Sequence, residues 1–423
     1  MEYRLAYGKS GLSVELANDL DVTLVKPINL PGSPDPVGAL TQALREPLGS
    51  RPLHQLVSPG DRIGIVVNDI TRPTPTPMIL DALRDALAAI PDEDIQLFIA
   101  TGTHRANTRD ELEGMLGSRW LDCFTIHQND ALDEPSHVEV GRTRAGGPVL
   151  FHRELMACDL RIATGFIEPH IFAGFSGGGK AFLPGMAGLD TILANHSSAN
   201  IDNPNATWGV IEGNPIQAEI REAAAFCQPS FLVNVTLNQE RKISRVFAGE
   251  LLSAHQAGCD FVKQNTMVPV EQAFDIVITT NAGYPLDLNV YQSVKGMSAA
   301  AQITRPGGAI IIAAECWDGI PEHGEYARLM QLADTPAGIL EQVRAPGFIC
   351  QDSWQAQIQT LIAVEKNIYL YSHLLPEEKM RQVKLNPSPS IEATVETLLD
   401  RFGQSARICV MPEGPLTIPY IQA

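Results

Sequence analysis

The segment Gly165–Asn200 constrains this chain more than any other stretch. It carries His170, Lys180 and His196 among the glycines Gly174, Gly177, Gly178, Gly179, Gly185 and Gly188. Glycine loses more backbone entropy on folding than other residues, so this density of glycines disfavours a regular helix or strand. Glycine also lets the backbone approach another group closely, and three chemically active side chains lie between these glycines. The segment therefore predicts a cofactor or phosphate site.

A nucleotide-binding phosphate loop is one interpretation of this segment. Gly174 to Lys180 fits the pattern G-x-x-x-x-G-K, but Ala181 stands where that loop needs a hydroxyl for magnesium. The residues Pro184 and Gly185 oppose the helix that should follow the loop. A phosphate-loop-like nucleotide-binding protein remains an alternative.

Charge and composition narrow the class of partner. The 31 basic residues are outnumbered by 49 acidic ones, which gives a net charge of −18 and argues against nucleic acid and anionic membranes. No apolar run is long enough for a signal peptide or a membrane span. Seven scattered cysteines without a C-x-x-C pair indicate reduced thiols. We expect a cytoplasmic protein that acts on a small molecule.

The hydrophobic pattern predicts strands that alternate with helices. Buried strands are predicted at Arg62–Asn68, Ile95–Ala100 and within Leu155–Thr164, and a polar segment follows each one. A second alternating series begins at Phe274–Thr280. Such alternation is typical of α/β domains with mainly parallel sheets, which bind ligands at the carboxyl ends of their strands.

We therefore predict two α/β domains. The first spans residues 1–265, and the second spans residues 273–400 after a linker at Thr266–Glu271.

Three histidines and a few cations could carry chemistry. A histidine side chain ordinarily titrates near neutral pH, so two of the three residues His104, His170 and His196 could serve as acid and base. Imidazole also binds nickel, zinc, copper or iron, and three histidines could form the zinc site of a hydrolase. Arg72 and Lys295 are candidates for binding a substrate carboxylate or a phosphate.

Five separated motifs resemble the nickel-dependent lactate racemase family. They are DITRPTP (69–75), TGTHR (101–105), EPHIFAGFSGGGK (168–180), NHS (195–197) and YQSVKG (291–296). They occur in the order that the family shows.

The resemblance implies a role for each matching residue. Lys180 would carry a nickel-pincer nucleotide, a pyridinium mononucleotide bearing a thioamide and a thiocarboxylate, in covalent linkage. His196 would bind the nickel, with Lys180 at the same metal centre, and His104 and His170 would be the acid/base pair. Further residues would hold the cofactor (Asp69, Ile70, Thr71, Arg72, Gly177, Gly178, Gly179) or the substrate (Arg72, Gln292, Lys295, Trp354).

The resemblance also implies a fold, a reaction and partners. The family has two α/β domains with the active site in the cleft between them, and with this architecture the last strand, within residues 404–423, is expected to return to the first domain. Its members racemise or epimerise a 2-hydroxy acid, lactate or a relative, by reversible hydride transfer, and depend on cofactor-maturation enzymes. A metal-dependent hydrolase and a non-catalytic ligand-binding protein are the alternatives from other classes.

Overall fold

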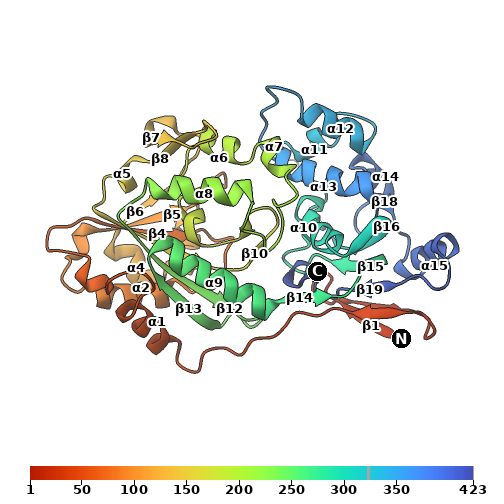
Figure 1. Ribbon diagram of the computed structural model, residues 1–423, viewed down its shortest axis with the longest axis horizontal. Coiled ribbons are helices and arrows are strands. Elements are labelled where there is room, and N and C mark those ends of the chain that lie inside the picture. The colour runs from red at the N-terminus through yellow and green to blue at the C-terminus, as the bar shows by residue number, and fades with distance from the viewer. Residues whose placement is uncertain (322–323, 423) are drawn as a thin grey trace. The chain divides into compact units, whose positions relative to one another are not determined.

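The computed structural model describes residues 1–321 and 324–422 (Figure 1). The contacts of the chain divide it into two compact units. One unit contains Asn29–His196 and Asn203–Asn265, and we call it the Lys180 unit. The other contains Met1–Ile28, Ser197–Asp202 and Thr266–Ala423, and we call it the Lys295 unit. Each unit is built around its own six-stranded sheet.

The sheet of the Lys180 unit has the strand order β13-β12-β9-β4-β5-β6. Its strands are β4 (Ile63–Asn68), β5 (Ile95–Ala100), β6 (Thr125–Gln128), β9 (Leu160–Phe166), β12 (Ser230–Leu237) and β13 (Ile243–Gly249). All neighbouring strands are parallel except β12 and β13, which form an antiparallel hairpin. The carboxyl ends of β4, β5 and β9 consequently lie on one edge, where the predicted polar segments begin.

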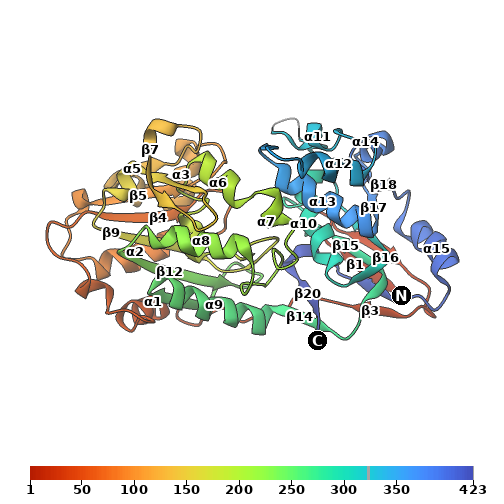
Figure 2. The same ribbon diagram turned by 45° about the horizontal axis from the view of Figure 1, so that its top comes forward.

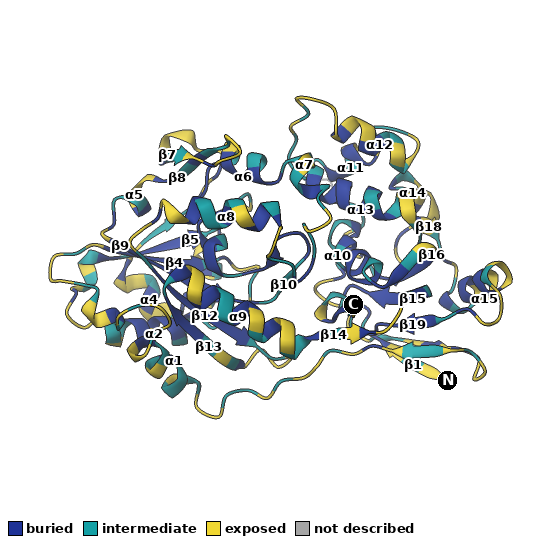
Figure 3. Ribbon diagram, in the orientation of Figure 1, coloured by how far each residue is buried: buried dark blue, intermediate teal, exposed yellow. Residues whose placement is uncertain are grey.

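Helices and two small hairpins complete this unit. The helices are α1 (Pro36–Arg45), α2 (Thr76–Ala86), α3 (Arg109–Leu116), α4 (Ser118–Cys123), α5 (Arg153–Met156), α6 (Leu189–Asn195), α8 (Pro215–Ala225) and α9 (Leu251–Thr266). The hairpins pair β7 (His137–Arg142) with β8 (Pro148–His152), and β10 (Pro169–His170) with β11 (Gly174–Phe175). Leucines of α1, α2 and α3 pack with the β-branched residues of the sheet in one apolar core. Figure 3 shows the sheet strands largely buried. This core fixes the strand ends that carry the candidate residues.

The sheet of the Lys295 unit is entirely parallel. Its order is β18-β17-β16-β15-β19-β3, with strands β3 (Val22–Leu24), β15 (Phe274–Thr280), β16 (Thr304–Ala313), β17 (Asn367–Tyr371), β18 (Asn386–Pro387) and β19 (Ile408–Val410). Its helices are α7 (Ser198–Ile201), α10 (Val290–Ala301), α11 (Tyr326–Leu329), α12 (Pro336–Val343), α13 (Ser353–Glu365), α14 (Glu377–Gln382) and α15 (Ile391–Phe402). The uninterrupted apolar runs of β15 and β16 match strands that are covered on both faces.

Both ends of the chain depart from the predicted boundaries. The first 28 residues belong to the Lys295 unit, where β3 pairs with β19 and the hairpin of β1 (Glu2–Leu5) and β2 (Leu12–Glu15) precedes it. Figure 2 shows this red segment among the blue elements of the C-terminal half. The last strand, β20 (Ile418–Ile421), also stays in this unit and does not return to the first domain. It pairs in parallel with β14 (Met267–Val270), so the predicted linker is itself a strand. Sequence periodicity misses such pairings because the partners are far apart in the chain.

No helix in the part of the chain that the structure describes is long and apolar enough to cross a membrane.

Candidate functional site

Asp69 and His104 form a hydrogen-bonded pair at the ends of two neighbouring strands. Asp69 directly follows β4, and His104 lies in the loop after β5. His104 Nδ1 lies 2.7 Å from Asp69 Oδ2, and the Thr71 hydroxyl donates to Asp69 Oδ1 at 2.6 Å. The Asp69 side chain is only 5% exposed, whereas 54% of the His104 side chain is open to solvent. An ionised carboxylate only accepts hydrogen bonds, so the proton of the neutral ring belongs on Nδ1.

Hydrogen bonding keeps the Asp69 carboxyl group ionised. Burial alone would raise the pKa of Asp69, because it disfavours the charged form. The hydrogen bond and charge of His104, the hydrogen bond from Thr71 and the charge of Arg72 together outweigh burial and leave the pKa of Asp69 below its ordinary value. The predicted cofactor residue Asp69 therefore has a protein partner as well.

The Nδ1 atom of His170 faces a hydrogen-bond donor, whereas that of His104 faces an acceptor. It lies in β10, opposite Gly174 of β11, in the small hairpin of the glycine-rich segment. The backbone N–H of Ala173 donates to His170 Nδ1 at 3.2 Å. Nδ1 must then hold a lone pair, and the proton of the neutral ring belongs on Nε2.

The ring of Phe172 gathers three of the predicted residues. The His170 and His196 rings meet it edge to face, with centroids 4.7 Å and 4.9 Å from the Phe172 centroid. Lys180 Nζ lies 5.8 Å from the same centroid. No sequence pattern had singled out Phe172, although it stands two residues after His170 inside the longest motif. This aromatic ring is the common wall against which the acid/base, covalent and metal candidates lie.

The buried position of Lys180 favours the neutral form of its amine. It lies in a short 3-10 helix, Gly178–Ala181, where burial lowers its pKa to about 7 and the charge of Arg72 acts in the same direction. A neutral amine is nucleophilic, whereas the usual ammonium is not. Arg72 also lowers the pKa of Asp69, so its charge links the Asp69–His104 pair with the group around Phe172.

His196 ends α6 and presents a nitrogen suited to a metal. Its Nδ1 is 3.0 Å from the carbonyl oxygen of Ile192, so Nδ1 donates and Nε2 keeps the lone pair. The side chain is buried, and burial, followed by the charge of Lys180, lowers its pKa to about 3. The ring therefore stays neutral at physiological pH, as a metal-binding imidazole must.

The structure explains why three adjacent glycines occur at Gly177–Gly179, because neighbouring protein atoms leave little room for a side chain there. A Cβ on Gly177 would lie 2.5 Å from Asn234 Oδ1, and one on Gly178 would lie 2.5 Å from His255 Cγ. A Cβ on Gly179 would press on Ile220. These glycines let the segment pack against protein side chains. Their contact with a cofactor remains a prediction.

Two alternative interpretations of the motifs do not match the structure. Gly174 to Lys180 forms a strand and a 3-10 turn, and no α-helix follows Lys180 before α6, so it is not a phosphate loop. Among the described residues, no three His, Cys, Asp or Glu side chains gather as a metal site, so His104, His170 and His196 do not form the predicted zinc alternative.

The remaining candidates lie in the Lys295 unit. Gln292 and Lys295 lie in α10, whose N-cap Asn289 accepts from the Gln292 N–H at 3.0 Å. Trp354 is buried near the start of α13. It hydrogen-bonds the phenol of Tyr291, which also approaches the Asp352 carboxylate. Tyr291, which the sequence analysis did not choose, therefore ties Trp354 to the first turn of α10.

Comparison with known proteins decides the family. Profiles of the lactate racemase N-terminal and C-terminal domains match residues 7–209 and 270–418. A protein of Lactiplantibacillus plantarum named lactate racemase is 36% identical over 378 residues, 88% of each chain. The lactate racemase of Thermoanaerobacterium thermosaccharolyticum is 34% identical over 418 residues, 97% of each chain. This chain belongs to the lactate racemase family. The protein is therefore an isomerase, a racemase, as the five motifs predicted.

Solved structures confirm the predicted fold class for this member of the lactate racemase family. The lactate racemase apoprotein of T. thermosaccharolyticum has a TM-score of 0.91 at 32% identity and covers 99% of this chain and 100% of its own. A Thermotoga maritima protein with a TM-score of 0.64 and 20% identity, covering 91% and 97% of the two chains, shares the fold. The protein has two α/β domains with mostly parallel sheets.

Proposed function

We propose that this protein inverts C2 of a small 2-hydroxy acid, with lactate as the first candidate. The observation that carries the proposal is the group around Phe172, where Lys180, His170 and His196 face one ring. These residues coincide with the motifs of a family whose relatives are named lactate racemases. A metal-dependent hydrolase is not favoured, because the described residues do not assemble its metal site.

The residues present fit the cofactor that the resemblance implies. Lys180, an amine with its pKa lowered to about 7, would hold the nickel-pincer nucleotide covalently, and His196 Nε2 would bind the nickel. A single protein nitrogen suffices if the cofactor itself supplies the other ligands. Asp69–Arg72 and Gly177–Gly179 would hold its remaining parts. When bound, this group supplies the acceptor for the C2 hydrogen, which leaves as hydride.

The histidines supply the proton transfers. For one enantiomer, one of the pair His104 and His170 removes the proton from the 2-hydroxyl oxygen. After the bound 2-keto acid has rotated, the other histidine returns a proton to that oxygen. The roles exchange for the opposite enantiomer. Each histidine therefore acts on the oxygen, and neither needs to abstract the C2 hydrogen.

Cations and amides of the predicted set bind the rest of the substrate. A guanidinium can hold a carboxylate with two parallel hydrogen bonds, which suits Arg72. Lys295 and Gln292 add a cation and an amide from α10, and Trp354 an aromatic face. The partners of the protein are then the 2-hydroxy acid and the enzymes that mature the cofactor.

Inversion in heavy water tests the proposal. Protein produced together with the maturation enzymes should racemise lactate and leave C2 essentially free of solvent deuterium, because hydride does not exchange with water. Substrate deuterated at C2 should keep its label and react more slowly. Substantial solvent label at C2 would show that a histidine abstracts the C2 hydrogen as a proton, which contradicts the hydride route. A protein with covalently bound cofactor and nickel that inverts no 2-hydroxy acid would contradict the function itself.

A further inference from the structure

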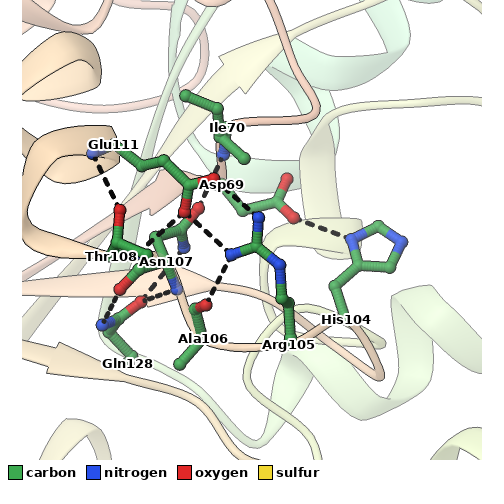
Figure 4. A network of polar contacts seen from close by, with 9 residues as sticks. All are labelled: Asp69, Ile70, His104, Arg105, Ala106, Asn107, Thr108, Glu111 and Gln128. Atoms are coloured by element: carbon green, nitrogen blue, oxygen red, sulfur yellow. Dashed lines mark hydrogen bonds and ion pairs between the residues drawn. The ribbon is translucent and has the colours of Figure 1, made fainter.

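Asn107 and Gln128 form a reciprocal set of hydrogen bonds between the ends of β5 and β6 (Figure 4). The Gln128 Oε1 atom accepts from the backbone N–H of Asn107 at 2.7 Å and from Asn107 Nδ2 at 3.1 Å. In return, Gln128 Nε2 donates to the Asn107 carbonyl oxygen at 3.0 Å. Both polar atoms of the Gln128 side-chain amide therefore hydrogen-bond to the same residue, Asn107.

Asn107 extends this connection to the third strand end. Its side-chain oxygen accepts from the backbone N–H of Ile70 at 3.2 Å, and only 6% of Asn107 is exposed. The loop after β4 is thereby joined through Asn107 to the loop after β5 and to the end of β6. We call Asn107 and Gln128 the amide clamp. Since Asn107 is buried, losing one of its partners leaves a polar atom there without a hydrogen bond.

The clamp holds the backbone on both sides of the Asp69–His104 pair. Asp69 immediately precedes Ile70, and His104 stands three residues before Asn107. Neither loop belongs to a strand at these positions, so strand pairing does not fix the spacing of Asp69 and His104. The hydrogen bond of Asn107 to Ile70 joins the two loops close to that pair.

We infer that Asn107 and Gln128 are positioning residues, which hold Asp69 against His104 and thereby keep the proton of the neutral His104 ring on Nδ1. The Nε2 atom of His104 is then the atom that exchanges a proton with the substrate hydroxyl. This inference rests on the proposed function for its catalytic consequence. The tautomer itself is a property of the protein alone.

A neighbouring set of contacts provides the matched control. Thr108 accepts from the Glu111 N–H, and the Glu111 carboxylate accepts from the Thr108 N–H, which makes a capping box at the start of α3. These bonds stabilise the same loop but do not join it to Ile70. Thr108→Ala should therefore lower the melting temperature without altering the His104 tautomer.

The decisive variant is Gln128→Glu. It keeps the shape and the accepting oxygen, but it replaces the Nε2 donor with an oxygen that faces the Asn107 carbonyl. Asn107→Asp is the second variant, since it retains the acceptor for the Ile70 N–H but loses the side-chain donor to Gln128 Oε1. Thermal unfolding first establishes that each variant is folded.

The tautomer of His104 is read from the ¹⁵N shifts of its ring in histidine-labelled protein made without cofactor, with the His104→Gln spectrum for assignment. The unaltered protein should show the Nδ1–H form, and both clamp variants should show a mixture of the two tautomers.

Activity is the second measurement. In the cofactor-loaded clamp variants, kcat/KM should fall roughly 10- to 100-fold at unchanged nickel content, because a small displacement of a reacting group slows the reaction strongly. Thr108→Ala should stay within about twofold.

Folded clamp variants that keep the Nδ1–H tautomer and full kcat/KM would overturn the inference, and so would equal losses in the Thr108→Ala control. Failure of the proposed function gives a different result. The His104 tautomer would then respond to the clamp variants, while the loaded, unaltered protein would invert no 2-hydroxy acid.

Discussion

The Nδ1 atoms of His104 and His170 face opposite kinds of hydrogen-bonding partner. His104 Nδ1 meets the Asp69 carboxylate at 2.7 Å, and His170 Nδ1 meets the N–H of Ala173 at 3.2 Å. In the neutral rings the proton then lies on Nδ1 of His104 and on Nε2 of His170. The two rings differ in the atom that carries the proton, so one offers an acceptor at Nε2 and the other a donor. Such a difference suits an acid–base pair.

Replacement of either histidine should slow both directions of racemisation. We expect His104→Ala and His170→Ala each to lower kcat/KM by about 10²–10⁴-fold. The enantiomers have equal free energies, so kcat/KM must fall by the same factor for both. Initial rates from each pure enantiomer, at equal nickel content, provide the measurement. The exposed His54 supplies the control. A His104→Ala enzyme as active as His54→Ala would contradict a role for His104 in proton transfer.

Lys180 should carry the cofactor. Its lowered pKa of about 7 makes the neutral amine available for a covalent bond near physiological pH. Protein produced with the maturation enzymes should be heavier by one nucleotide adduct, and the adduct should map to the Lys180 peptide. Fully active protein with an unmodified Lys180 would falsify this assignment. Lys180→Arg keeps a cation but no such amine and should acquire no adduct.

The same lysine should make the stability of cofactor-free protein depend on pH. The folded-state pKa is about 7 and the ordinary value is 10.5, so between these values the unfolded chain binds more protons and stability rises with pH. Lys180→Met removes this cost. Its stabilising effect should be largest at or below about pH 7 and should shrink towards about pH 10. Melting temperatures at both ends of this range test the prediction, and a gain that increases with pH would contradict it.

His196→Ala should separate metal binding from covalent attachment. The variant loses the imidazole Nε2 that is predicted to bind nickel, but it leaves Lys180 in place. We therefore expect the adduct to remain while most of the nickel and the activity are lost. Metal analysis beside the intact mass checks both points, with His54→Ala as the control. Stoichiometric nickel in His196→Ala would show that His196 is not a nickel ligand and only caps the C-terminus of α6.

Gly178 should be intolerant of a side chain even without cofactor. Its φ is +57°, and an added Cβ would lie 2.5 Å from the His255 ring, which hydrogen-bonds the Ser176 carbonyl. Overpacking and backbone strain together should cost roughly 2–4 kcal/mol in Gly178→Ala. Gly114, which lies in α3 with nothing within 4 Å of an added Cβ, is the matched site. Gly114→Ala should be neutral or stabilising by up to about 1 kcal/mol. Urea unfolding compares the two, and equal stabilities would refute the packing argument.

Local patterns in the sequence predicted most of the elements near the site. The apolar runs that became β4, β5 and β15 were recognisable because a buried strand needs them, and Thr108 with Glu111 indicated the start of α3. The pairing of β14 with β20 and the place of the first 28 residues were missed. In both cases the partners are separated by more than a hundred residues, so no local period records them.

The sequence by itself determined which chemical groups this protein has and which family it belongs to. The motifs singled out Lys180, His196, His104 and His170 as candidates, because each lies in a short stretch of distinctive residue types. Tertiary structure decided the state of those groups. Burial lowers the pKa values of Lys180 and His196, and the hydrogen bond to Asp69, which is far from His104 in the sequence, places the ring proton of His104. Desolvation and hydrogen bonding depend on neighbours that only folding brings together, which is why the sequence could name these residues but not their protonation.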